Sequence, residues 1–328
     1  MKRNPVFAPL QSGVTLIELM VSLTIGLIIM LAVVNAYLGA AGAGRTSEVI
    51  GRMNEDAQMA LTILSQQLRM AGVNPSQPDR GTMTAPNINV RNNTVPLHNT
   101  LTNAFAIRGC DLTFSNVALT AVVTGGLTCG HSASSTGPDS IAIAYEADQY
   151  NTVATSAGVP TDCMGSGITP NSAIFTRSDG STTATATIYE AENRFYVGTS
   201  TSVVNPTLYC KGNASTNGQP LIENIDNLQF SYGTSNPAST PTKVLGYLSA
   251  YEVDTETSSG FLTGSAGSAT RWNAVKTVRI CVVARSENPV LDTIESAKYR
   301  DCNGALTTPP DKRLRRAYTT TVVLRNQQ

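Results

Sequence analysis

A long uncharged segment near the amino terminus constrains this chain more than any other feature. Residues 19–44 carry no charged side chain, and most of them are apolar. A helix of about 20 apolar residues is long enough to span a bilayer. Lys2 and Arg3 precede the segment, and positive residues beside a membrane helix favour the cytoplasmic side. The sequence therefore predicts a membrane helix whose following residues lie outside the cytoplasm.

The parts around this segment are not arranged as in a cleaved secretory signal. Such a signal places positive charge, then an apolar region, then a small-residue cleavage site. Here a short polar leader ends in Gly13 and the apolar run follows it, beginning VTLIEL at Val14. This text resembles the type IV prepilin signal, although Val14 departs from the phenylalanine that is more common there. The resemblance implies that prepilin peptidase cuts after Gly13 and N-methylates Val14, so that the apolar helix is retained.

Glu18 is the one acidic residue at the start of the apolar run. A charged side chain inside a membrane helix costs about 2.5–3.5 kcal/mol on insertion scales, and such residues usually have a function and a partner. The prepilin resemblance implies that this partner is the freed α-amino group of Val14 in a neighbouring subunit. The alternative is that Glu18 lies at the headgroup level of a plain membrane anchor.

Helical periodicity continues beyond the apolar run. From residue 45 to 71, apolar residues recur at spacings of three, four and seven, as in an amphipathic helix. Gly72 is suited to cap the carboxyl end, and Pro75 prevents continuation. We therefore expect one helix from about residue 14 to 71, with an apolar face that needs a globular domain to pack against. A simple stalk or coiled coil is the alternative. The stripe consists of Val49, Met53, Ala57, Met59, Ala60, Leu61, Leu64, Leu68 and Ala71.

Strand signals dominate the rest of the chain. Residues 75–140 are rich in Pro, Gly, Asn and Thr and indicate loops with short strands at 101–107 and 119–123. Because later strands follow one another without intervening helices, the sheet should be antiparallel. The predicted fold is α+β: a long N-terminal helical spine packed against a mainly antiparallel, pilin-like β head. Later strands are expected at 141–147, 185–198 as a hairpin turning near Glu192-Asn193, 207–212, 221–233 after a near-helical start, 275–285 and 317–326.

Three segments of the last third extend the resemblance. LIENIDNLQFSYG (221–233), VKTVRICVVARSENP (275–289) and RRAYTTTVVLRN (315–326) are similar to text of the PilW class of minor type IV pilins. Minor pseudopilins of type II secretion share this architecture. The chain is thus expected to contain a leader (1–13), a transmembrane and assembly helix (14–44), its amphipathic continuation (45–72) and a periplasmic β-rich head (73–328).

Six cysteines all follow the predicted membrane helix. An even number of cysteines in an exported domain indicates disulfides. Six cysteines allow 15 pairings, and sequence does not choose among them, although 110 with 129 and 281 with 302 are the simplest local closures. Free buried thiols are an alternative, and a zinc site lacks the paired short spacings it requires. The cysteines are Cys110, Cys129, Cys163, Cys210, Cys281 and Cys302.

Motifs for catalysis are missing from the sequence. It contains no G-x-S-x-G, H-E-x-x-H, phosphate-loop or dinucleotide-binding text, and its two histidines, His98 and His131, are far apart. We therefore expect no enzyme and no cofactor. Glu252, Asp254 and Glu256 would share one face if their segment were a strand, and such a ladder could bind calcium or be a solvated face.

Charge gives a weak case for nucleic-acid binding. The chain has 23 Lys+Arg and 23 Asp+Glu, so the formal net charge is 23 − 23 = 0. Lys312, Arg313, Arg315 and Arg316 form a short basic cluster, which could meet an acidic partner, DNA or lipid. A solvated loop or a contact with a neighbouring subunit is the favoured interpretation, and the charge balance argues against direct nucleic-acid binding.

Together these features favour a minor type IV pilin that helps to prime or assemble the pilus at or near its tip. The resemblance implies as partners the prepilin peptidase, other minor pilins, the major pilin and a tip adhesin. It implies a bacterial inner-membrane protein with a periplasmic head that later reaches the pilus and cell surface, and it connects the pilus with adhesion, twitching motility or DNA uptake. A type II secretion pseudopilin and a tip adhesin or ligand-binding module are the alternatives.

Overall fold

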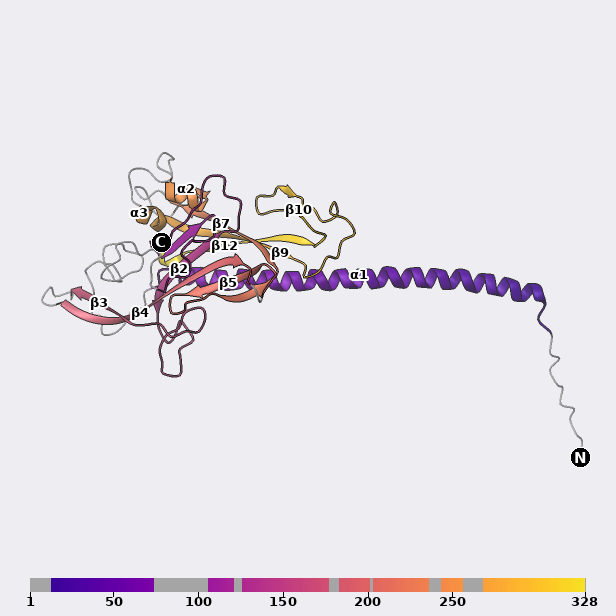
Figure 1. The fold of residues 1–328 in the computed structure, drawn as a ribbon, viewed down its shortest axis with the longest axis horizontal. Coiled ribbons are helices and arrows are strands. Elements are labelled where there is room, and N and C mark those ends of the chain that lie inside the picture. The colour runs from indigo at the N-terminus through magenta and orange to yellow at the C-terminus, as the bar shows by residue number, and fades with distance from the viewer. Residues whose placement is uncertain are drawn as a thin grey trace, which may run out of the picture. The chain divides into compact units, whose positions relative to one another are not determined.

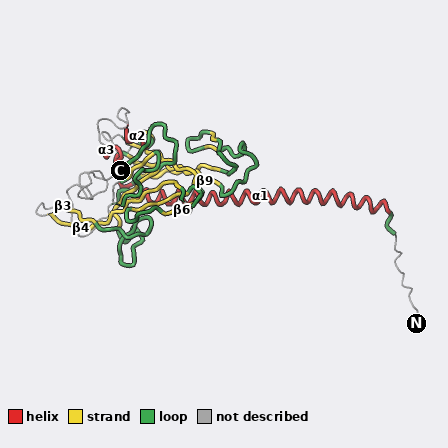
Figure 2. Tube along the Cα trace, in the orientation of Figure 1, coloured by secondary structure: helices red, strands yellow, loops and turns green. Residues whose placement is uncertain are grey.

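The chain forms two compact units, residues 1–51 and 52–328, which are described separately. The structure is a computed structural model, and it describes residues 13–73, 106–120, 126–176, 183–200, 203–235, 243–255 and 268–327. Helix α1 (Leu16–Met70) begins in the first unit and ends in the second. Figure 1 and Figure 2 show α1 and the strands of the second unit.

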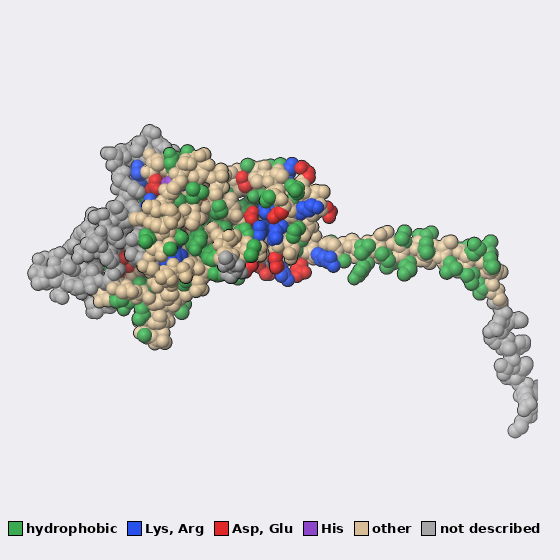
Figure 3. Space-filling model, viewed as in Figure 1, with side chains coloured by type: hydrophobic (Ala, Val, Ile, Leu, Met, Phe, Trp, Pro, Cys, Tyr) green, Lys and Arg blue, Asp and Glu red, His purple; other side chains and the backbone are tan. Residues whose placement is uncertain are grey.

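The first unit consists of the initial part of α1. Its large apolar side chains from Leu16 to Leu38 stand on the helix surface, with exposed fractions from 46% at Val34 to 81% at Leu16, whereas Val49 and Ile50 are half-buried. Figure 3 shows these side chains along the helix. Among the residues that the structure describes, none packs against these side chains, so the described part of the chain leaves this apolar surface uncovered.

The second unit buries the predicted stripe of α1. Met53, Ala57, Ala60, Leu61, Leu64 and Leu68 are buried, and Ala71 follows them into the core. Met59 is 57% exposed, because it lies off the face that carries the others. Gly72 ends the helix with a φ of 70°, as expected of a carboxyl-terminal cap, and its amide donates a hydrogen bond to the carbonyl of Ala144.

One sheet has the order β1-β2-β4-β5-β6, and β3 pairs with β4 beside this path. All its pairings are antiparallel. Strand β4 is long enough to pair with β3 through its first residues and with β2 through later ones. The bounds are β1 Ile107–Cys110, β2 Ser140–Ala147, β3 Asn171–Thr176, β4 Thr183–Gly198, β5 Thr207–Gly212 and β6 Gln219–Glu223.

A second antiparallel sheet has the order β12-β9-β7-β8. Two short helices follow β8, and the pair β10-β11 lies between β9 and β12 in the chain. The bounds are β7 Ile225–Thr234, β8 Gly246–Leu248, α2 Ala250–Thr255, α3 Ser268–Asn273, β9 Val275–Arg285, β10 Tyr299–Arg300, β11 Leu306–Thr307 and β12 Arg315–Val323, followed by a 3₁₀ turn at Arg325–Gln327.

The expected α+β architecture is confirmed, with the buried face of α1 and the inner faces of both sheets in one hydrophobic core. Leu64 and Leu68 contribute from the helix, Phe195 from the first sheet and Ile280 from the second. Trp272 and Tyr232 meet edge to face within it, with ring centroids 4.9 Å apart.

Three details differ from the sequence predictions. Residues 183–198 form one strand rather than a hairpin turning near Glu192-Asn193, because both residues lie in ladders with β2 or β5 and their polar groups have partners. Residues 221–223 belong to β6, not to a helical start, and Asn224 turns the chain into β7 with a φ of 62°. Leu119 and Thr120 are not in a strand, whereas 101–105 and 121–123 lie outside the described residues.

All six cysteines form disulfides in the second unit. The two local closures are present as Cys110–Cys129 and Cys281–Cys302. The third bond, Cys163–Cys210, joins the loop after β2 to β5. A disulfide restricts the unfolded chain and typically adds about 2–4 kcal/mol of stability, so the bonds stabilise a head that contains several long loops.

Candidate functional site

The predicted processing site lies just before α1. Gly13, Val14 and Thr15 are exposed and not helical. Thr15 caps the helix: its hydroxyl oxygen accepts a hydrogen bond from the amide of Glu18 (3.3 Å), and its carbonyl accepts one from Leu19 (3.1 Å). The bond between residues 13 and 14 is therefore in irregular, accessible backbone, the form that a peptidase can bind.

Glu18 lies in the first turn of α1 and is exposed. A carboxylate is favourable at this position because the amino-terminal end of a helix carries partial positive charge. Among the described residues, no cationic side chain forms an ion pair with it. Val14 precedes the helix, so the turn of helix that the sequence predicts between Val14 and Glu18 is not formed in this uncleaved chain.

The surface of α1 next to this site is apolar and suited to a hydrophobic environment. Helix α1 is long and apolar enough to cross a membrane, and its apolar window is not buried within the chain. Apolar side chains at this density need lipid or other helices as neighbours. Processing segment, carboxylate and apolar surface thus follow one another along the first unit.

The proposed calcium ladder is not formed. Residues 250–255 are helix α2, not a strand, so the alternation that would align Glu252 with Asp254 is absent, and Glu256 lies outside the described residues. The Glu252 carboxylate accepts a hydrogen bond from the amide of Ser249 at the start of the helix. The Asp254 carboxylate accepts one from the indole of Trp272 at 2.8 Å.

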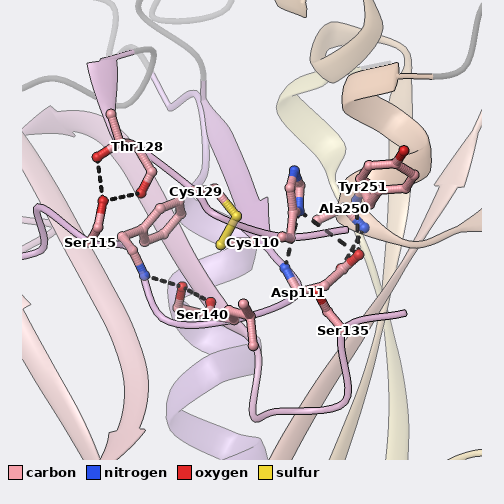
Figure 4. Close-up of a disulfide and its surroundings, with 12 residues drawn as sticks. Cys110, Asp111, Ser115, Thr128, Cys129, Ser135, Ser140, Ala250 and Tyr251 are labelled. Atoms are coloured by element: carbon pink, nitrogen blue, oxygen red, sulfur yellow. Dashed lines mark hydrogen bonds and ion pairs between the residues drawn. A yellow bond between two sulfur atoms is a disulfide. The ribbon is translucent and has the colours of Figure 1, made fainter. Parts of the chain in front are cut away.

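Asp254 instead belongs to a cluster with His131 and Asp111. Figure 4 shows Asp111 of this cluster beside the Cys110–Cys129 disulfide. The side chain of His131 is 7% exposed and lies between two carboxylates, with Nδ1 3.9 Å from Asp111 and Nε2 3.4 Å from Asp254. Asp111 also accepts hydrogen bonds from the amides of Ala250 and Tyr251, and it points toward them in Figure 4. The disulfide thereby brings residues next to Cys110 and Cys129 against α2.

This cluster is poorly suited to a metal. A ring nitrogen of His131 lies within 4.8 Å of the sulfur atoms of Cys110 and Cys129, but these sulfur atoms are bonded to each other. Metal-binding cysteines act as thiolates, which a disulfide does not supply. The arrangement is a structural clasp between three segments that are distant in sequence.

The basic cluster near the carboxyl terminus is divided by the fold. The guanidinium of Arg315 is buried and forms ion pairs with Asp226 at 2.8 Å and Asp311 at 2.5 Å. The hydrogen bond from Arg315 keeps the pKa of Asp311 below its usual value. Arg313 donates to the carbonyls of residues 286 and 287, and it also lies 3.5 Å from Asp311. Only Lys312 and Arg316 of the cluster are exposed, so no continuous basic patch forms.

A buried charged layer was missed at the sequence level. Arg194 is fully buried in β4, where it contacts the Glu192 carboxylate (Nε to Oε1, 2.6 Å) and the carbonyls of Val117 and Leu119. The Nζ of Lys211, on the neighbouring strand, donates to the carbonyls of Leu119 and Gly212. The layer fastens the loop after β1 onto the sheet.

Glu190 lies in the same layer, and its two side-chain oxygens are buried and have no hydrogen-bond partner among the described residues. Burial, followed by the nearby charges of Glu192 and Glu146, raises the pKa of Glu190 from 4.5 to about 8. Burial and the neighbouring Arg194 lower the pKa of Lys211 to about 8. The only sequence signal was the alternation of residues 190, 192 and 194, and charged residues at that spacing more often mark a solvated strand face.

Two family comparisons match opposite ends of the chain. Residues 9–34 match the prokaryotic N-terminal methylation motif, and residues 194–326 match type IV pilus-assembly protein W (PilW). No curated protein and no solved structure matches the chain. The first match covers the processing segment and the exposed apolar helix, and the second covers β4 from Arg194 through β12. Together the two matches support a PilW-class type IV pilin.

Proposed function

We propose that this chain is a minor pilin that helps to prime or assemble a type IV pilus at or near its tip. The two family matches support a pilus-associated minor pilin, and the methylation motif implies processing by prepilin peptidase and assembly with other pilins. The observation that carries the proposal is the uncovered apolar surface of α1, which begins directly after the processing segment. In this proposal the role of the chain is structural, with no catalytic step.

The proposed division is a leader (1–13), an assembly helix (14–44), its continuation (45–72) and a head (73–328). The apolar helix and the motif fit an inner-membrane anchor. In the proposal, the head is periplasmic before assembly and reaches the surface in the pilus. The three disulfides support this placement, because such bonds persist in oxidising compartments.

Cleavage after Gly13 would create an α-amino group on Val14. We assign Glu18 to neutralise the amine of an adjacent subunit when the helix enters the filament. The absence of a cationic partner for Glu18 within the described chain supports an intermolecular partner. Assembly then buries the apolar surface of α1 against other helices.

The amino terminus of the mature chain tests the processing step. Mass spectrometry of membranes and of sheared filaments should find N-methylated Val14 in both fractions. An intact Met1, or a cut elsewhere, would contradict the proposal and leave a membrane-anchored exported domain.

A substitution at Glu18 tests assembly. Glu18→Ala should insert in the membrane normally but should support few or no filaments, because the neighbour's amine is left unpaired. Glu55→Ala is the matched control, since Glu55 is an exposed carboxylate on the same helix within the second unit. Filament numbers counted by electron microscopy should fall only for Glu18→Ala, and normal numbers would exclude the assigned role.

Deletion of the gene separates the alternative functions. Loss of pili indicates assembly, whereas normal pili that fail to adhere indicate a tip adhesin. Retained pili with a block in protein secretion indicate a type II secretion pseudopilin. The match to PilW is the observation that favours the pilus over the secretion system.

A further inference from the structure

Strand β12 is a long sheet edge that no described part of the chain covers with a further strand. It has nine residues, compared with three in β8 at the other edge of the same sheet. In the first sheet, β1 has four residues, and β6 has five residues that include Pro220 and a register shift against β5. Natural proteins shorten, kink or charge exposed edges because free backbone groups attract other strands. β12 has a regular register with β9, no proline, and no charged residue from Ala317 to Val323.

The register shows which backbone groups of β12 point away from β9. The amide of Leu324 donates to the carbonyl of Lys276, and that of Ser286 donates to Leu314. In an antiparallel ladder, residues alternate between facing the partner strand and facing away. Even-numbered residues of β12 therefore bond to β9, and Ala317, Thr319, Thr321 and Val323 direct their N–H and C=O groups outward. Among the described residues, no group pairs with these outward groups.

A groove follows this edge. Helix α1 lies along β12, since the Tyr318 hydroxyl donates to the side chain of Asn54 and Asn326 donates to the carbonyls of Arg69 and Ala71. The space between them has a volume of about 340 Å³. Gln58, Thr62, Gln66 and Arg69 line it from the helix, and Thr319 and Thr320 line it from the strand.

We propose that this groove accepts an extended segment of a second, different polypeptide, which adds to the sheet as a strand beside β12. Main-chain hydrogen bonds supply affinity in this mode of recognition, and alternate side chains supply specificity. The segment should be uncharged or acidic, because Arg69 is the only charged residue among the described residues that line the groove, and the exposed Arg316 lies toward the other end of the strand. Another copy of β12 fits less well, since it would bring its own α1 against this helix. The inference does not depend on the role assigned to Glu18.

Photo-crosslinking in the native cells tests the proposal on the full chain. A benzoylphenylalanine at Gln66 places the reactive group in the groove, and the same residue at the exposed Met59, outside the groove, is the control. We expect position 66 to capture one extended segment of another protein and position 59 not to do so. Product at the level of the control, or capture of a second copy of this chain, would overturn the proposal.

A backbone substitution shows whether the capture depends on the strand edge. Thr321→Pro removes an outward N–H and leaves the bonds to β9, whereas Thr321→Ala keeps that N–H. Losing this bond and gaining the proline ring should lower the crosslink yield about tenfold for Thr321→Pro only. An unchanged yield would refute strand addition. Thermal unfolding checks that the variant folds, and Thr319→Pro replaces it if it does not.

Discussion

Apolar side chains are mostly exposed in the first unit of this protein and mostly buried in the second. Leu27, in the first unit, is 72% exposed, whereas Leu64, further along the same helix, is fully buried beneath the sheets. Both residues have the same chemistry and the same backbone conformation. The difference shows that the head supplies its own hydrophobic core, while the apolar side chains of the first unit find no such core within the described residues.

The polar residues differ in the same way. Glu18 has no cationic partner within the described chain, whereas the charged groups of the head are largely paired with one another or with carbonyls. Arg194 and Arg315 illustrate this pairing. A unit with unsatisfied apolar and charged groups is suited to assembly, and a unit that satisfies both can fold before assembly.

The largest expected effect is the difference in unfolding free energy between alanine variants of Leu64 and Leu27. Leu64→Ala removes a buried side chain and leaves a cavity, so it should lower the free energy of unfolding of the head by about 3 kcal/mol. Leu27→Ala should leave that value unchanged, because its side chain is outside the core. Urea unfolding of the full-length protein in detergent, followed by Trp272 fluorescence, measures both. Equal losses would show that the two parts of α1 do not differ as described.

A smaller difference in unfolding free energy is expected between alanine variants of the neighbouring Arg315 and Arg316. Arg315→Ala leaves Asp226 and Asp311 without their shared cation and should cost about 2 kcal/mol of unfolding free energy. Arg316 is exposed and stacks on Tyr318 with 5.7 Å to the ring centroid, so Arg316→Ala should change stability by no more than about 0.5 kcal/mol. The same unfolding assay compares them, and similar costs would restore a shared surface role for the basic cluster.

A third difference concerns the pH dependence of the stability of the head. The pKa of Glu190 is raised from 4.5 to about 8, so the folded state holds a proton that the unfolded state releases in this range. The resulting stability is fully present below about pH 4.5 and is lost as the pH rises to about 8.

Glu190→Gln keeps the shape of the side chain and cannot ionise. Unfolding measured between pH 5 and 8 should have a shallower slope in this variant than in the native protein. Lys211 acts in the opposite sense above pH 8, since its pKa is lowered to about 8 and its unfolded form holds the extra proton. Identical slopes for the two proteins would show that Glu190 is not buried as an acid.

Short sequence patterns predicted much of the fold. The stripe from Met53 to Leu68 repeats within a few residues, and the cap at Gly72 follows directly after it, so both could be predicted without tertiary information. The period-two strand at 275–285 was equally clear. The alternation of β4 was interrupted by polar residues, and sequence alone gave no reason to keep it as one strand.

The candidate sites also divide into those set by neighbouring residues and those set by tertiary contacts. Gly13, Val14 and Glu18 could be proposed from contiguous text, and their roles remain proposals to be tested. The calcium ladder failed because its premise, a strand that carries Glu252, Asp254 and Glu256, is not met: residues 250–255 form helix α2, in which Asp254 meets Trp272 and His131. These partners come from distant parts of the chain.

By itself, the sequence determined the apolar helix, its amphipathic continuation, the β-rich head and the prepilin-like leader, because each depends on interactions over a few neighbouring residues. Only the tertiary structure decided which cysteines pair, which charges are neutralised and which strand remains an open edge. Those outcomes depend on contacts between residues such as Cys163 and Cys210, or Arg315 and Asp226, that are far apart in sequence. Burial makes such contacts strong, and burial is a property of the folded chain.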